Sequence, residues 1–249
     1  MANWQDPRTT TTGMNPAAAT VGVPRAARDA GLRSYMLSVY NYMASGVLLT
    51  GIIALLFAPY AGDVLRSPNG GMSGLGWIVM LSPLAIVFAM SFGMQRMKTS
   101  TLQLLFWAFA GLMGLSMSTI FLVFTGTSIA QTFFAVAAAF MGLSLYGYTT
   151  KKDLSGFGTF LIMGVVGLLV AMLINLFLQS SAMALAISAI GVLLFAGLTA
   201  YDTQRIKSMY FYVQGTEMMG KTVIMGALTL YLDFINMFQF LLSFMGDRR

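Results

Sequence analysis

The 249-residue chain contains no cysteine and no histidine, and only 9% of its residues are charged. Without cysteine it can form no disulfide, no thiolate metal site and no thiol nucleophile, and without histidine it lacks the usual acid–base side chain. Any titration near neutral pH must therefore come from carboxyl groups in unusual surroundings. Soluble domains carry about a quarter charged residues, so this scarcity of charge, together with 57% hydrophobic residues, indicates a membrane protein.

The net charge of +6 would suggest a nucleic-acid partner in a soluble protein. Here the basic residues sort to one side of the predicted membrane segments. The inner segments hold Arg8, Arg25, Arg28, Arg33, Arg96, Lys98, Lys151, Lys152, Arg205, Lys207 and Lys221, and the outer ones hold Arg66, Arg248 and Arg249. This asymmetry predicts a cytosolic N-terminus and an external C-terminus. The asymmetry explains the net positive charge by insertion into a lipid bilayer, and no nucleic-acid partner is needed.

Seven apolar runs follow one another, each near the roughly 20 residues that span a bilayer. We place them at about 35–58, 75–93, 102–124, 129–149, 156–178, 183–202 and 222–245. Short linkers at 125–128 and 179–182 predict antiparallel hairpins, and the linker 203–221 is the longest between helices. The sequence therefore predicts an all-α integral membrane protein with seven transmembrane helices.

The first 33 residues are polar and contain a run of threonines, Thr9 to Thr12, but no apolar stretch that could act as a signal peptide. We interpret 1–33 as a disordered cytosolic tail and 34–249 as the membrane domain.

Two carboxylates mark the candidate site. Asp233 lies in the apolar run from Val223 to Met245, more than 15 Å along a helix from Lys221, which is close to the centre of a hydrocarbon core about 30 Å thick. An ionised side chain at that depth costs several kcal/mol by most estimates, so it should face protein, water or an ion rather than lipid. Asp202 closes the preceding apolar run.

Polar residues share a helical face with each carboxylate. Thr229, Asn236 and Ser243 follow the spacing of Asp233, and Ser188 and Thr199 follow that of Asp202. Such stripes suit a buried pathway, with Thr199, Thr229, Asn236 and also Asn175 as candidate lining residues. Hydrogen bonding between helices is the alternative interpretation, and for Asn175 it is the preferred one.

If the two carboxylates meet, they cannot both ionise cheaply, and the pair would share a proton and titrate near physiological pH. A cation beside them would favour the ionised form. Arg96, at the inner end of the second apolar run, is the candidate, although it is equally explained as one of the positive-inside residues.

Two strings resemble the Bax inhibitor-1 family, also called the transmembrane Bax inhibitor motif family, and its bacterial branch in particular. They are AYDTQRIK, Ala200–Lys207, and LTLYLDFIN, Leu228–Asn236. The resemblance implies a seven-helix fold with the last helix central, in the bacterial cytoplasmic membrane, that acts as a pH-sensitive calcium leak. It implies that Asp202 and Asp233 form the hydrogen-bonded pH sensor, and that Arg96 latches to Asp202. An acidic residue found in the second helix of some members has no counterpart here.

The favoured function is thus a pH-gated calcium leak without enzymatic activity or cofactor, in which Asp202 and Asp233 bind calcium transiently. One alternative is a membrane-embedded regulator of a membrane protease or stress pathway that moves no ions. A second is an intramembrane aspartyl protease, because those enzymes also use two aspartates on consecutive helices. Their second aspartate follows Gly-x-Gly, however, whereas Asp233 follows Leu230-Tyr231-Leu232.

Overall fold

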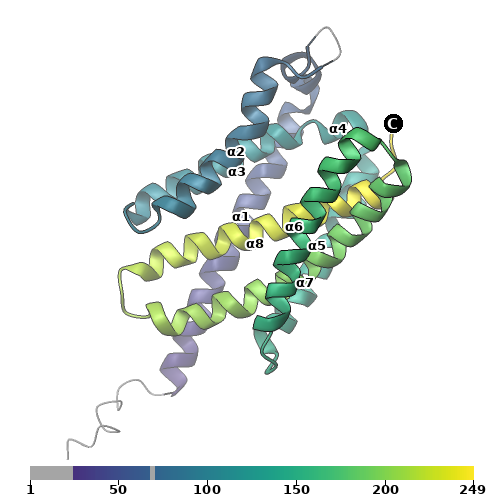
Figure 1. The fold of residues 1–249 in the computed structure, drawn as a ribbon. Coiled ribbons are helices and arrows are strands. Elements are labelled where there is room, and N and C mark those ends of the chain that lie inside the picture. Colours follow the sequence, from purple (N-terminus) through teal and green to yellow (C-terminus); the bar gives the residue numbers. More distant parts are fainter. Residues whose placement is uncertain (1–24, 68–70) are drawn as a thin grey trace, which may run out of the picture.

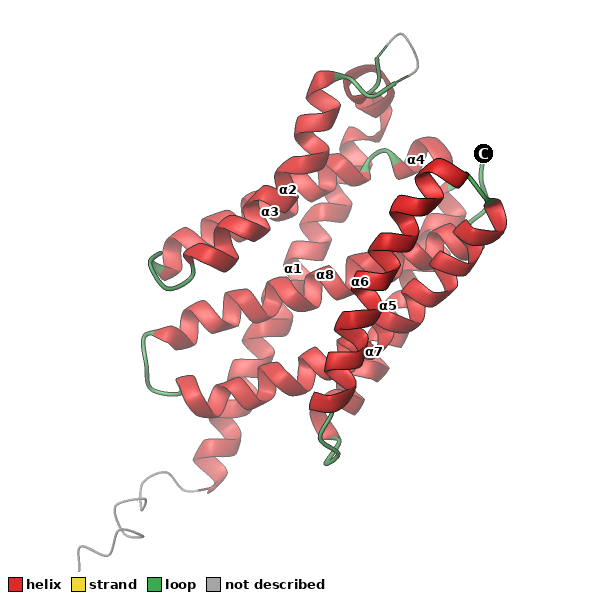
Figure 2. Ribbon diagram, viewed as in Figure 1, coloured by secondary structure: helices red, strands yellow, loops and turns green. Residues whose placement is uncertain are grey.

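The computed structural model describes residues 25–67 and 71–249, and within these ranges it is built from helices without a named strand (Figures 1 and 2). The helices are α1 (Arg25–Leu65), α2 (Gly74–Gly93), α3 (Thr99–Met117), α4 (Ile120–Val123), α5 (Gly126–Thr149), α6 (Ser155–Leu178), α7 (Ser181–Val213) and α8 (Met218–Met245).

Seven of these segments are long and apolar enough to cross a membrane, with α3 and the short α4 forming one of them. The predicted fold class and number of spans are confirmed. The hairpin linkers are as short as predicted, because α4 is joined to α5 by residues 124–125 and α6 to α7 by residues 179–180.

Two predicted boundaries are wrong, and both errors concern polar residues. α1 begins at Arg25, so residues 25–33 are helical and not part of a tail; residues 1–24 lie outside the described ranges. The predicted linker 203–221 does not exist as a loop, since α7 continues to Val213 and only residues 214–217 separate it from α8. Hydropathy marks where a helix leaves the apolar core, and it does not mark where the helix ends.

The last helix is the central one, as expected. α8 packs against α7, α1, α5 and α3, and two thirds of its most apolar window is buried against one third or less in every other span. In Figure 1 it runs behind α6 between the α2–α3 pair and the other helices. The fully buried Tyr231 ties this centre together: its hydroxyl lies 2.6 Å from Thr50 Oγ1, which donates to the Ala110 carbonyl.

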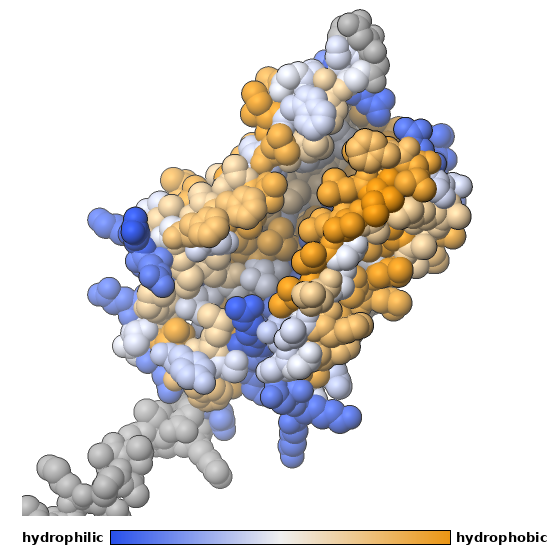
Figure 3. Space-filling view, in the orientation of Figure 1, coloured by the Kyte–Doolittle hydropathy of each residue, from blue (hydrophilic) through white to orange (hydrophobic). Residues whose placement is uncertain are grey.

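The helix ends form two opposite faces of the molecule (Figure 1). The start of α1 and the loops 94–98, 150–154 and 214–217 lie on one face, which we call the basic face because it carries Lys98, Lys152 and Lys221. The C-terminus lies on the other, where residues 123–125 bind residues 247–249 through backbone hydrogen bonds. Figure 3 shows hydrophobic residues over the middle of the visible surface and hydrophilic ones toward its two ends, as a bilayer requires.

Candidate functional site

Asp202 of α7 and Asp233 of α8 lie with their carboxyl groups against one another, within hydrogen-bonding reach. They are the two acidic residues in the buried part of the described chain, at 7% and 4% exposure. Asp233 Oδ2 is buried without a hydrogen-bond partner among the described residues. The structure thus brings together the two carboxylates that the sequence singled out, and it leaves one of their oxygens open to a proton or a cation.

Two glycines hold α7 in place just before Asp202. The α-carbon of Gly147 on α5 approaches the backbone of Ala200 so closely that a β-carbon there would collide with the Ala200 carbonyl. On the other side, the ring of Tyr201 covers Gly158 of α6, where a β-carbon would collide with the ring. Because larger residues would push these helices apart, the two glycines set the position of the carboxylate pair.

A cation lies near Asp202, but it comes from the same helix. Arg205 Nη1 is 3.9 Å from Asp202 Oδ1, an i,i+3 contact, and its side chain is 60% exposed. This contact exists because α7 stays helical beyond residue 203. A linker at 203–221 would not bring Arg205 to Asp202, so the contact could not be predicted; it follows once Ala200–Lys207 is helical, because residues three apart are neighbours on a helix.

Arg96 does not take the place that the resemblance implies. It is exposed in the loop between α2 and α3 and makes no ion pair with a described residue. That loop packs against the start of α8, where Lys221 Nζ donates to the Gln95 carbonyl over 3.3 Å. Since Asp233 is twelve residues further along α8, about 18 Å, the loop lies far from the carboxylate level.

The residues around Asp202 fix α7 to its neighbours by polar contacts that sequence reasoning missed. Thr203 Oγ1 donates to Ser144 Oγ of α5 over 3.4 Å, and Lys207 Nζ donates to the Tyr148 carbonyl over 2.7 Å. Gln204 clamps the loop between α5 and α6, since its Nε2 donates to the Lys152 carbonyl and its Oε1 accepts from the Leu154 N–H. Every residue of the string from Tyr201 to Arg205 thus has a defined contact.

The same loop carries an exposed acid outside the membrane spans. Asp153 Oδ1 accepts hydrogen bonds from the Ser155 N–H at 2.9 Å and the Ser155 hydroxyl at 2.6 Å. These bonds favour the ionised form and lower the pKa of the Asp153 carboxyl below its ordinary value. Asp153 therefore stays charged at the start of α6 and takes no part in the buried pair.

Three of the four candidate lining residues lie within about a turn of the carboxylates. Thr199 and Thr229 donate to the carbonyls of Phe195 and Met225 in their own helices, over 2.8 and 3.1 Å. Asn236 Nδ2 donates to the Leu232 carbonyl over 2.8 Å. Because their donors are used within the helix, the side-chain oxygens remain as acceptors that could face a cation.

Asn175 has a structural role instead. Its Oδ1 accepts from the backbone N–H of Ser180 over 3.0 Å and closes the turn between α6 and α7. Ser188 lies fourteen residues before Asp202 on α7, about 21 Å away along the helix, and Ser243 is exposed. These three residues therefore do not extend the polar surface around the carboxylates.

The pair does not form a cage for a resident metal. Among the described residues, no three acidic side chains come together. Hard divalent cations in stable sites take six or more oxygen ligands, more than two carboxylates provide even with neighbouring hydroxyls. The geometry suits transient contact with an ion and sharing of a proton between the two acids.

Comparison with known proteins covers nearly all of the membrane domain. Residues 32–249 match the family model described as inhibitor of apoptosis-promoting Bax1. An uncharacterised protein of Rickettsia prowazekii is 48% identical over 224 residues, which is 89% of this chain and 92% of that protein. The inner membrane protein YbhL of Escherichia coli K12 is 44% identical over 224 residues, 88% of this chain and 94% of its own. The chain is thus a multi-pass membrane protein, and it belongs to the Bax inhibitor-1 family.

Proposed function

We propose that the protein is a pH-sensitive cation leak in which the pair Asp202–Asp233 is the pH sensor. The observation that carries the proposal is the buried contact between these two carboxyl groups, on the helix pair that packs most extensively in the molecule. Two like charges in such surroundings cannot both form at low cost, so the pair holds one proton over part of the pH range.

A leak fits this site better than a carrier does. The site offers few charges and no cage, so an ion would stay briefly, and rapid conduction needs weak binding. Calcium is the ion that membership of the family implies. Asp202, Asp233 and the oxygens of Thr199, Thr229 and Asn236 are the hard ligands that it would meet.

The latch of this protein is Arg205 rather than Arg96. The guanidinium attracts Asp202 only while that carboxyl is ionised, so the contact is present at higher pH and is lost as the pH falls and the pair takes up a proton. Arg205 is largely exposed, so the attraction is worth about 0.2–1 kcal/mol. Arg205 therefore favours the closed state without preventing opening.

Localisation follows the bacterial relatives. We place the protein in the cytoplasmic membrane with the basic face in the cytosol, because ten of the basic residues listed above for the inner side lie on that face or on the α1 segment beside it.

Two other functions are retained as outcomes of the test. A regulator without ion transport would need a surface that contacts its partner, and the segment 203–221 offers only the four-residue loop 214–217 between α7 and α8. An aspartyl protease would use the same pair for acid–base catalysis. Asp233, however, lies inside a continuous helix and not on a loop that could admit a peptide.

The test is calcium flux into liposomes that contain the purified chain and a calcium indicator, measured between about pH 5 and 8. We expect flux that depends on pH and on the protein. The same liposomes carry a transmembrane peptide. Cleavage of that peptide without flux would indicate a protease instead of a leak. The absence of both flux and cleavage would favour a regulator.

A further inference from the structure

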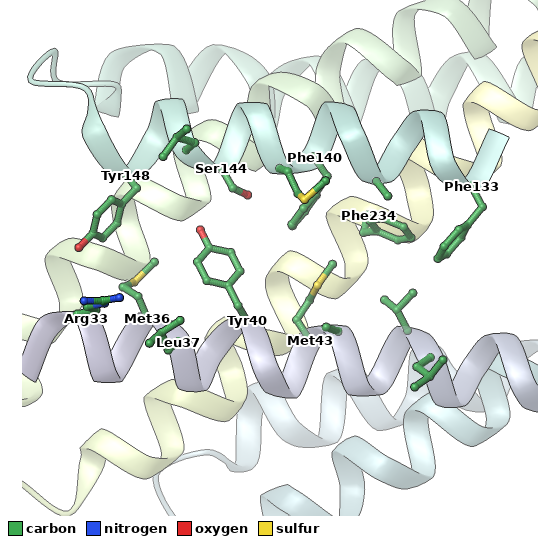
Figure 4. A pocket seen from close by; sticks show the side chains of 16 residues that line it. Arg33, Met36, Leu37, Tyr40, Met43, Phe133, Phe140, Ser144, Tyr148 and Phe234 are labelled. Carbon is green, nitrogen blue, oxygen red and sulfur yellow. The ribbon is translucent and has the colours of Figure 1, made fainter. Parts of the chain in front are cut away.

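A deep apolar groove separates α1 from α5. The two helices both pack on α8 but not closely on each other, and the space between them has a volume of about 850 Å³. Figure 4 shows side chains of both helices pointing into it, with Phe234 of α8 at the back. The rim residues Leu37, Leu48 and Leu145 are each more than half exposed, so the groove opens sideways, toward the lipid.

One end of the groove is polar and charged. Arg33 and Tyr148 lie there on opposite walls (Figure 4), near the basic face of the molecule. Lys207 adds a second cation behind Tyr148, 4.8 Å from the centre of its ring. From Arg33 to Leu48 the walls are otherwise apolar, apart from the hydroxyls of Tyr40 and Ser144.

We propose that this groove binds one acyl chain of an anionic phospholipid, with the headgroup phosphate at Arg33. The groove follows α1 from Arg33 to Leu48, a rise of about 22 Å, which exceeds the roughly 15 Å of hydrocarbon in one leaflet. A cation at the polar end and an apolar floor beyond it match the phosphate and the chain of a lipid in that order. Attraction of anionic headgroups to arginine and lysine next to the membrane supplies the charge complementarity.

The volume of the groove is sufficient for an acyl chain. About sixteen methylene groups, each near the roughly 30 Å³ of a water molecule, need roughly 500 Å³. The volume of about 850 Å³ therefore accommodates the chain along the whole groove.

The lipid would lie directly behind the carboxylate pair. The Tyr40 hydroxyl, on the groove wall, lies beside those of Ser144 and Thr203, and Thr203 follows Asp202 in the chain. Phe234, at the back of the groove, follows Asp233. An occupant therefore contacts Phe234, which is next to Asp233, and Tyr40 and Ser144, which lie beside the neighbour of Asp202. Binding itself does not rest on the proposed function and is measured without flux.

The experiment is native mass spectrometry of the purified chain with phosphatidylglycerol or phosphatidylcholine added at equal concentration. The wild-type chain should retain one phosphatidylglycerol several times more often than one phosphatidylcholine. A filled groove, Ala44→Phe with Ala137→Phe, should reduce that retention at least fivefold, because both alanines line it. The matched control is Ser45→Phe with Ala138→Phe, which adds the same two rings at the next residues of the same helices, at exposed positions outside the groove.

Variants of Arg33 distinguish binding of the headgroup from binding of the acyl chain. Arg33→Gln should abolish the preference for phosphatidylglycerol while keeping weak retention of both lipids, and Arg33→Lys should keep part of it. Equal retention by the filled and control proteins would overturn the proposal, as would an unchanged preference in Arg33→Gln. A dimer that the wild type forms and the filled groove abolishes would also overturn it, and would make this surface a contact between copies. If the filled-groove variant loses its lipid but the wild-type protein conducts no calcium at any pH, the lipid site is supported and the leak is rejected.

Discussion

At the scale of single residues, the proposed function depends on the two buried acids, Asp202 and Asp233. An asparagine at either position keeps a group that can hydrogen-bond to the remaining acid, so Asp202→Asn and Asp233→Asn should both fold. Each change removes the pair that shares a proton. We therefore expect calcium flux from both variants to lose its wild-type pH profile. If both retain that profile, the pair is not the sensor, whatever its geometry.

Arg205 and Arg96 form a matched comparison, since both are exposed arginines near the basic face and only Arg205 contacts Asp202. Arg205→Gln should raise the leak up to about fivefold at mildly alkaline pH, where Asp202 is ionised and the contact is worth at most about 1 kcal/mol. At acidic pH the ratio of variant to wild-type flux should approach one. Arg96→Gln should leave the ratio at one throughout. The reverse pattern would mean that Arg96 reaches Asp202 in a conformation other than this one.

At the scale of helices, the close contact of α5 with α7 should be the least tolerant of added volume. Gly147→Ala places a β-carbon against the Ala200 carbonyl, and we expect it to lower the free energy of unfolding by about 1–3 kcal/mol. Gly142→Ala, on the same helix, meets nothing within 4 Å and should be neutral or stabilise the protein by about 0.5–1 kcal/mol. Denaturant unfolding in detergent measures both. Similar values for the two variants would show that α5 and α7 can separate without cost.

The elements also show which features the sequence could predict. The apolar runs predicted the seven spans, because membrane insertion depends on hydropathy, which is a property of the sequence. Asp202 and Asp233 could be identified because they are charged residues in or at the end of such runs. The polar end of α7 was missed because it is stabilised by contacts distant in sequence, such as Gln204 with Lys152 and Leu154. That error placed Arg205 in a loop and removed it from the candidates, whereas Arg96 was proposed from its place at the inner end of the second apolar run and from the family resemblance.

At the scale of the whole molecule, the groove and the carboxylate pair share α8, and α5 packs on both α7 and α8, so the proposed lipid site and the proposed pH sensor have helices in common. The separation of α1 from α5 could not be predicted from the sequence either. Both helices are apolar on several sides, as lipid-facing helices are, and nothing in their composition distinguishes a face that packs on protein from one that borders a groove.

The orientation of the protein in the membrane can be tested by cysteine labelling, because the chain has no cysteine. Single cysteines can therefore be introduced without a background. Asp63→Cys and Asp247→Cys lie at exposed positions on the face opposite the basic one, and Lys152→Cys and Glu217→Cys at exposed positions on the basic face. The surplus of basic residues predicts that the first two react with a membrane-impermeant maleimide in intact cells.

The second pair of cysteines should react only after the inner membrane is permeabilised, because the basic face is expected in the cytosol. Asp63→Cys and Asp247→Cys also test the number of spans, since they lie at the ends of the first and the seventh membrane segment. Labelling of one but not the other in intact cells would contradict the seven-span fold. Labelling of the basic-face pair alone would preserve the fold and reverse its direction, and Arg205 and its contact with Asp202 would then respond to the external pH instead of the cytosolic one.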